Sequence, residues 1–198
     1  MSKLSIFFLV LQLVVFLGLG VVNPLLEPLN MRVRLLVDSS RNMKLRPLMI
    51  LTHRYNDIVS LSVQLLLLAG LVGLLWQDWR RAMVLTSAMF VQTTVVSAFK
   101  RLTSVVRPPQ ELSHVFMTSG SYPSGHSSAS LTFALLVPTV LMPHIPYPFV
   151  VAIAIYLYVV ALLTAYGRLY LDVHWLSDII GGWVLAGATY MLSLIFLN

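Results

Sequence analysis

The chain has 198 residues, enough for one domain, and 58% of them are hydrophobic while only 10% are charged. Because about a quarter of the residues in a soluble domain are charged, this composition excludes an ordinary water-soluble protein and indicates a chain solvated largely by lipid. The net charge of +6 comes from basic residues between long apolar runs, so it favours anionic headgroups or an anionic substrate over nucleic acid. The chain has no cysteine, which excludes disulfides and thiol–metal sites.

Six apolar segments approach the length of about 20 residues that a membrane-spanning helix needs. They are residues 4–22, 58–76, 82–99, 127–142, 149–166 and 179–197. The first is too long for the apolar region of a signal peptide and has no alanine for a cleavage site, so we expect a retained helix. The fourth is short and contains Pro138, which predicts a kink. The predicted fold is all-α, a six-transmembrane-helix bundle forming a single membrane-embedded domain over residues 1–198.

Six spans place both termini on one side of the membrane, together with the short turns at 77–81 and 143–148. The opposite side receives three longer connections, at 23–57, 100–126 and 167–178. All the polar motifs of the chain lie in these three connections or at the span ends beside them. We therefore predict one functional face on that side.

The connection between the first two spans contains a helical pattern. Apolar residues recur at helical spacing from Leu25 to Leu36, whereas Arg32, Arg34 and Arg41 lie on the other faces. This pattern predicts an amphipathic helix lying in the membrane interface, with its arginines near anionic headgroups. A surface helix packed over the bundle fits the pattern equally well.

Three cations on the functional face favour a phosphate ligand. Lys100 and Arg107 come from one connection and Arg168 from another, and gathering them at a membrane surface is costly unless an anion accompanies them. A phosphate spreads its charge over several oxygens, which suits the planar fork of arginine. Ser124 and Gly125 lie at the start of a predicted span, where free backbone N–H groups and the helix dipole also favour an anion.

Two histidines supply the groups needed for phosphoryl transfer. His174 and Asp178 are four residues apart, so on a helix they share a face. A carboxylate that accepts a hydrogen bond from one ring nitrogen leaves the other nitrogen free to act as a nucleophile. His126 comes from a different connection and is available to protonate the leaving oxygen. Asp172 is on the wrong side of such a helix to orient His174.

The order of the motifs K-x6-R-P, P-S-G-H and R-x5-H-x3-D resembles the three-part signature of the type-2 phosphatidic acid phosphatase family. The resemblance covers residues 100–178, and the helix layout around this core also fits. The matching residues are Lys100, Arg107, Pro108, Pro123, Ser124, Gly125, His126, Arg168, His174 and Asp178. Three motifs in the correct order and with the correct internal spacing form a specific signal.

The resemblance implies a mechanism without a cofactor or metal ion. His174 would form a phosphohistidine, His126 would act as the general acid and Asp178 would orient His174. The phosphate would be held by Lys100, Arg107, Ser124, Gly125 and Arg168. The family often has serine just before the third-motif arginine, whereas this chain has Gly167, so one phosphate contact is in doubt.

The predicted function is hydrolysis of a lipid phosphomonoester or diphosphate, such as polyprenyl diphosphate, phosphatidylglycerol phosphate, phosphatidate or lipid A. A lipid phosphotransferase using the same intermediate is the alternative. An intramembrane serine hydrolase built on Ser124 and a small transporter are less favoured, because there is no second oxyanion-hole motif and the polar residues cluster at span ends. A metal hydrolase built from His114, His126 and His174 lacks a carboxylate-rich ligand set.

The orientation in the membrane has two opposing indications. Apart from the phosphate-binding cations, basic residues are more numerous on the functional side, which favours a cytoplasmic site. They are Arg32, Arg34, Arg41, Lys44, Arg46, Arg54 and Arg101, against Lys3, Arg80 and Arg81 on the other side. The resemblance points the other way, since many bacterial relatives act at the periplasmic face. We expect a bacterial inner-membrane protein with a periplasmic site, because arginines of an interfacial helix can attract the substrate.

Overall fold

The computed structural model describes residues 3–114 and 116–197, and every regular element in these ranges is helical. The α-helices are α1 (Lys3–Val22), α2 (Glu27–Ser39), α3 (Arg46–Tyr55), α4 (Ile58–Gly70), α5 (Trp79–Thr103), α6 (Gly125–Leu141), α7 (Tyr147–Tyr170) and α8 (Leu176–Leu197). Two short 3-10 turns, η1 (Asn23–Leu26) and η2 (Met43–Leu45), precede α2 and α3, and a π-helical turn, η3 (Leu71–Leu75), continues α4.

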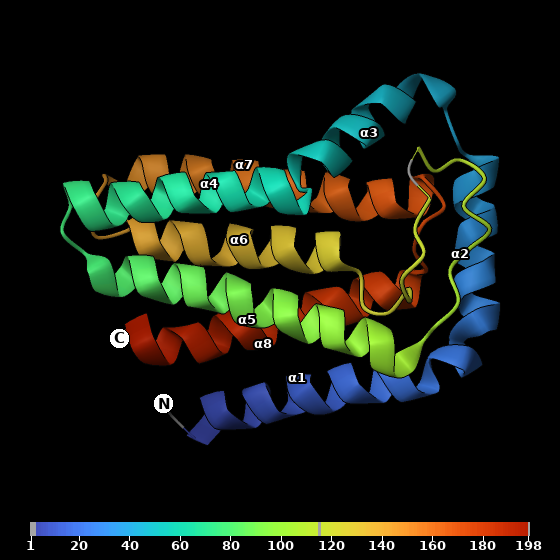
Figure 1. Cartoon of the computed structure of the whole chain (residues 1–198), viewed down its shortest axis with the longest axis horizontal. Helices are drawn as coiled ribbons and strands as arrows, with labels where there is room; N and C mark the ends of the chain where they lie inside the picture. Colours follow the sequence, from blue (N-terminus) through green and yellow to red (C-terminus); the bar gives the residue numbers. More distant parts are fainter. Residues whose placement is uncertain (1–2, 115, 198) are drawn as a thin grey trace.

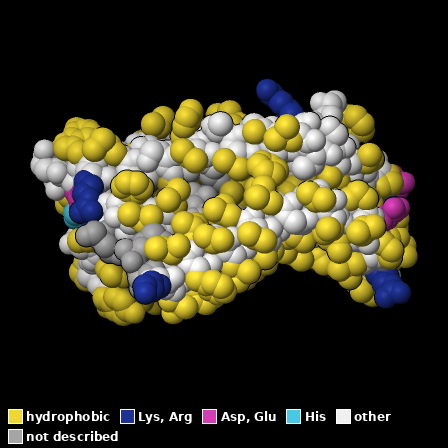
Figure 2. All heavy atoms as spheres, turned by 90° about the horizontal axis from the view of Figure 1, so that it is seen from below, with side chains coloured by type: hydrophobic (Ala, Val, Ile, Leu, Met, Phe, Trp, Pro, Cys, Tyr) yellow, Lys and Arg dark blue, Asp and Glu magenta, His cyan; other side chains and the backbone are white. Residues whose placement is uncertain are grey.

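Six helices lie side by side and form the predicted bundle, whereas α2 crosses one end of it (Figure 1). Five helical segments of the described chain are long and apolar enough to span a membrane, and α6, with 17 residues, is a shorter apolar helix. In the view of Figure 2, hydrophobic side chains cover most of the face, and the charged ones lie mainly toward its two ends. The prediction of an all-helical, multi-pass membrane bundle is confirmed.

Helix α6 is the centre of the bundle because it packs against α5, α7 and α8. Its buried side chains include small polar ones, Ser127, Ser128 and Thr132, next to apolar ones such as Leu136. By contrast, α1 lies at the edge, packs mainly on α8 and buries only Phe16 and Gly20. The first turn of α6 lies against Val96 of α5 and Gly182 of α8.

Four helices extend past the apolar segments that predicted them. Lys100 lies in the last turn of α5, Gly125 is the first residue of α6, Arg168 lies in the last turn of α7 and Asp178 lies in the first turn of α8. A hydropathy pattern ends at the first polar residue, whereas the backbone hydrogen bonds of a helix continue through it. As a result, these polar residues are held on helix ends rather than in loops.

The connection between the first two spans contains two helices, where the sequence predicted one. Helix α2 corresponds to the predicted amphipathic helix, and its position across the end of the bundle fits an interfacial placement (Figure 1). Helix α3 packs on α7 and was not predicted. Its buried face consists of Met49, Thr52 and His53, so two of its three inward residues are polar and apolar periodicity does not reveal it.

Helix α2 is fixed to the bundle by polar contacts. Asn30 donates to the Ser177 hydroxyl at 2.9 Å and accepts from the Ser177 backbone N–H at 3.1 Å. The guanidinium of Arg34 forms a two-pronged ion pair with Asp172, with both distances 2.8 Å. These contacts hold the loop before α8 against α2.

Candidate active site

The predicted site residues gather at the end of the bundle that α2 crosses. His174 lies in the segment between α7 and α8, and its side chain is buried with Asp178. His174 Nδ1 lies 3.2 Å from Asp178 Oδ2. The sequence-based placement of both residues on one helical face was wrong, because α8 begins only at Leu176. The contact forms because the Asp178 side chain reaches back over the helix start, where it also accepts the Trp175 backbone N–H at 2.8 Å.

Ser121 completes this arrangement, and the sequence did not predict it. Its hydroxyl is fully buried, donates to Asp178 Oδ2 and lies 3.3 Å from His174 Nδ1. The only sequence signal available was its position just before the P-S-G-H motif. Three groups therefore converge on one carboxylate oxygen: the hydroxyl of Ser121, the ring of His174 and the backbone N–H of Trp175.

The other ring nitrogen of His174 faces the cations. Arg107 Nη1 lies 3.4 Å from His174 Nε2, and because arginine can only donate, Nε2 carries the lone pair. The proton is then on Nδ1, which donates to Asp178. Burial, together with the positive charges of Lys100, Arg168 and Arg107, lowers the pKa of His174 well below its usual value. The imidazole is therefore neutral, with Nε2 available.

Lys100 and Arg107 are both held by the backbone that precedes the P-S-G-H motif. Lys100 Nζ donates to the carbonyl oxygens of Gly120 and Ser121 at 2.8 and 3.2 Å. Arg107 donates to the carbonyl oxygens of Ser119 and Gly120, at 2.8 and 3.2 Å. A Cβ at Gly120 would lie 2.3 Å from the Lys100 carbonyl oxygen, so only glycine allows this approach. The loop thus holds both cations of the K-x6-R-P motif beside His174.

Arg168 is buried, with only 1% of its surface exposed. Its Nη1 lies 2.5 Å from Nδ1 of His53, which comes from α3. Its Nε and Nη2 have no hydrogen-bond partner among the described residues. Two buried N–H groups of a charged guanidinium therefore remain available to an anion.

The P-S-G-H motif forms the start of α6, as predicted. Ser124 is the residue before the first helical turn, and its hydroxyl shares a hydrogen bond with Ser127 at 3.0 Å. Gly125 lies against Val96. His126 follows, and its Nε2 has no partner within the described part of the chain. The serine next to His174 is thus Ser121, and the Ser124 hydroxyl is turned toward its own helix.

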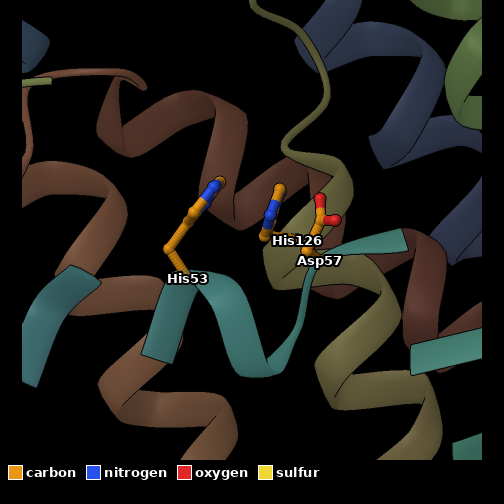
Figure 3. Close-up of side chains that lie close together, drawn as sticks. All are labelled: His53, Asp57 and His126. Atoms are coloured by element: carbon orange, nitrogen blue, oxygen red, sulfur yellow. The ribbon is translucent and has the colours of Figure 1, made fainter. Parts of the chain in front are cut away.

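Three described residues lie close enough together to be considered as metal ligands. Figure 3 shows His53 on α3, Asp57 in the turn before α4 and His126 on α6, with their side chains directed to the same side. Their ligand atoms all lie within 4.8 Å of one another. However, Nδ1 of His53 already contacts the guanidinium of Arg168, so a fixed positive charge stands beside the group. The positive charge of Arg168 opposes the binding of a metal cation at this group.

A groove between α4 and α5 reaches the site. Its volume is about 610 Å³, and its walls come from α4, α5 and the first turns of α6. Apolar residues such as Leu65 and Phe90 line it, and Lys100 and His126 also contribute to its walls. A lipid whose aliphatic chain lay in this groove would have its headgroup at the site.

The model of the PAP2 superfamily matches residues 81–198, which is more than half of the chain. The chain belongs to the PAP2 superfamily. Together with its membrane-spanning bundle, this membership makes it a multi-pass membrane phosphatase. The sequence matches no curated protein significantly.

Two solved structures of PAP2 type share the fold. A transmembrane PAP2-type phosphatidylglycerolphosphate phosphatase from Bacillus subtilis superposes with a TM-score of 0.86 at 20% identity, and the match covers 95% of this chain and 94% of that one. LpxE from Aquifex aeolicus gives a TM-score of 0.64 at 23% identity, covering 84% of this chain and 95% of the other. At these identities the likeness shows the fold alone.

The part of the chain that matches the PAP2 model does not include α1–α4. His53 and Arg34, which contact Arg168 and Asp172, lie in this unmatched part. The three motifs do not include these residues, because both lie in the connection between the first two spans. They became apparent only from the tertiary contacts.

Proposed function

We propose that this PAP2 phosphatase hydrolyses a lipid phosphomonoester or diphosphate through a phosphohistidine at His174. The observation that carries the proposal is the placement of the His174 ring between a carboxylate and a set of cations. Nδ1 is held by Asp178, and Nε2 lies beside Arg107. A neutral, oriented nucleophile next to a phosphate-binding cluster is what phosphoryl transfer requires.

In the proposed first step, Lys100, Arg107 and Arg168 hold the phosphate, with the backbone N–H groups at the start of α6. His174 Nε2 attacks phosphorus, and the bond between phosphorus and the lipid oxygen breaks. His126, which is protonated when the anionic substrate is bound beside it, gives a proton to that oxygen, so the lipid leaves as an alcohol, or as a monophosphate when the substrate is a diphosphate. Negative charge on the phosphoryl oxygens is stabilised by the cations throughout the step.

In the second step, water replaces the lipid on the His126 side. His126, now unprotonated, accepts a proton from the water, whose oxygen attacks phosphorus and breaks its bond to His174 Nε2. Inorganic phosphate leaves, and His174 and His126 regain their starting states. If another alcohol took the place of water, the same intermediate would give the alternative activity, a lipid phosphotransferase. Asp178 stabilises the positive charge that the His174 ring carries while phosphorylated.

The groove between α4 and α5 supports a lipid substrate. Its apolar walls would receive the hydrocarbon chain while the phosphate reaches Lys100 at its polar end. Thr93→Trp should fill the groove and lower activity on lipid phosphates while sparing p-nitrophenyl phosphate. Thr94→Trp is the matched control, because Thr94 is exposed on the same helix and does not line the groove. Equal losses in both variants would contradict this route.

The substrate classes that fit are polyprenyl diphosphate, phosphatidylglycerol phosphate, phosphatidate and lipid A. Phosphatidylglycerolphosphate gains support as the named substrate of the Bacillus subtilis relative. A panel of these lipids assayed with the purified protein in detergent would identify the substrate. Preference for an unrelated ester without a phosphate would refute the proposal.

We also propose a periplasmic site in a bacterial inner membrane. Two of the arginines that favoured the opposite orientation are engaged within the protein. Arg34 pairs with Asp172, and Arg41 pairs with Asp38 and lies 5.5 Å from the centre of the Tyr170 ring. Because these charges have structural partners, they are weak indicators of topology.

The test of the mechanism separates the two histidines. His174→Ala should abolish turnover of every substrate, since no covalent intermediate can form. His126→Ala should lose about 10²–10⁴-fold with lipid substrates but much less with p-nitrophenyl phosphate, whose leaving group needs no proton. A phosphoenzyme should then accumulate, and it should be acid-labile, base-stable and located at His174. A label on Ser121 or Ser124, or equal losses with both substrates, would refute the assignment.

A further inference from the structure

His53 on α3 contacts both Arg168 and His126, which belong to two different motifs. We propose that His53 is a positioning residue: one ring nitrogen holds Arg168 in its phosphate-binding position, and the ring face holds His126 against the leaving group. The proposal rests on the function proposed above and adds a residue from outside the region that matches the PAP2 model.

The contact with Arg168 fixes the direction of the guanidinium. Nη1 of Arg168 donates to Nδ1 of His53 at 2.5 Å, and both side chains are buried. Within the described residues, Nε and Nη2 of Arg168 have no partner, so the contact with His53 leaves these two donors for the phosphate. Without His53, the Arg168 side chain would lose one of the contacts that direct its free N–H groups toward the phosphate.

The contact with His126 is a ring stack. The two ring centres lie 4.5 Å apart with an angle of 20° between the ring planes. His114 closes the other side, with its ring edge-on to His53 at 4.5 Å. His126 Nε2 makes no hydrogen bond to any described residue, and the stack is one contact that restrains this ring next to the groove.

His53 can serve both neighbours because it is neutral. The groups that face it are Arg168 from α7, His126 from α6, His114 from the loop after α5, and Asp57 and Arg54 from its own connection. Burial and the charge of Arg168 lower the pKa of His53 to about 4. At neutral pH its Nδ1 therefore accepts a hydrogen bond, and the ring adds no positive charge beside His126.

Two substitutions separate the two contacts. His53→Asn keeps an acceptor close to the position of Nδ1 and removes the ring, whereas His53→Phe keeps a ring and removes the acceptor. Tyr55→Phe is the control for α3, because the Tyr55 hydroxyl contacts only that of Tyr156 among the side chains described. Vanadate inhibition reports the phosphate-binding groups, and the ratio of kcat for a lipid phosphate to kcat for p-nitrophenyl phosphate reports the leaving-group step.

The two His53 variants should change different measurements. His53→Phe should weaken vanadate inhibition about tenfold or more and lower activity on both substrates alike, because Arg168 is misdirected. His53→Asn should keep vanadate inhibition close to the wild type but lower kcat for the lipid phosphate about tenfold, with p-nitrophenyl phosphate spared. Tyr55→Phe should behave as the wild type in both measurements.

The proposal is overturned if both His53 variants lose vanadate affinity and both activities in the same proportion. That outcome means that His53 only supports the fold, and a matching fall in melting temperature would accompany it. The vanadate comparison needs no phosphohistidine. It therefore tests the contact with Arg168 even if the His174 intermediate is not found.

Discussion

The replacement Asp178→Asn isolates the charge of the carboxylate from its geometry. Oδ2 of Asp178 accepts from Ser121, from His174 Nδ1 at 3.2 Å and from the Trp175 backbone N–H at 2.8 Å. Oδ1 has no partner among the described residues. An amide whose oxygen takes the place of Oδ2 keeps all three donors, and its NH₂ group takes the place of Oδ1. His174 then keeps its orientation and its tautomer.

The expected loss of transition-state stabilisation in Asp178→Asn follows from the charge that develops on the His174 ring. When Nε2 attacks phosphorus, the ring becomes cationic, with Nδ1 at 3.2 Å from the carboxylate oxygen. Two unit charges at this separation interact by about 5 kcal/mol at an effective dielectric constant of about 20. The amide dipole replaces part of this interaction. We therefore expect a loss of about 3–5 kcal/mol in transition-state stabilisation, which is a decrease of about 10²–10⁴-fold in the rate.

The assay is single-turnover formation of the phosphoenzyme with labelled p-nitrophenyl phosphate, which reports the attack by His174 without a contribution from lipid release. Ser121→Ala is the matched control, because it removes one donor to Asp178 and keeps the charge. Its expected cost is about 1.5 kcal/mol, or about tenfold. The reasoning is refuted if Asp178→Asn stays within tenfold of the wild type, or if Ser121→Ala is the more damaging change.

Three further predictions test the metal, the buried histidines and the topology. Activity should survive EDTA without added Mg²⁺, and vanadate should inhibit; complete loss in EDTA that Zn²⁺ or Mg²⁺ reverses would show that the protein requires a metal ion. Burial lowers the pKa of His53 and His174, so below pH about 6.5 the unfolded chain takes up protons that the folded state does not. The melting temperature in detergent should therefore fall as the pH drops from 6.5 toward 4, and less steeply in His53→Phe; equal slopes would contradict the His53 contribution. Tags at the two termini should report one compartment and a cysteine at Glu111 the other, the latter being periplasmic; termini on opposite sides would disprove the six-span count.

The sequence determined the membrane bundle and the identity of most proposed site residues. A helix that spans the bilayer needs a long apolar run, and such a run can be recognised within one short stretch of sequence. The three motifs indicated Lys100, Arg107, Arg168, His126 and His174 because their spacing within each motif is a local property as well. The positions of these residues on helix ends were less predictable, since hydropathy does not mark where backbone hydrogen bonding stops.

The tertiary structure alone decided which side chains support that set. Ser121 meets Asp178 from 57 residues away along the chain, and His53 meets Arg168 from 115 residues away. Both are polar residues without periodicity or motif, so neither composition nor spacing distinguishes them from residues of an ordinary loop or surface helix. Their contacts depend on how α3, α6, α7 and α8 pack together, and packing of distant segments is not encoded in any short stretch of sequence. The sequence thus indicated the residues proposed to react, and Asp178 as the residue proposed to orient His174, whereas the packing revealed the additional contacts of Ser121 and His53.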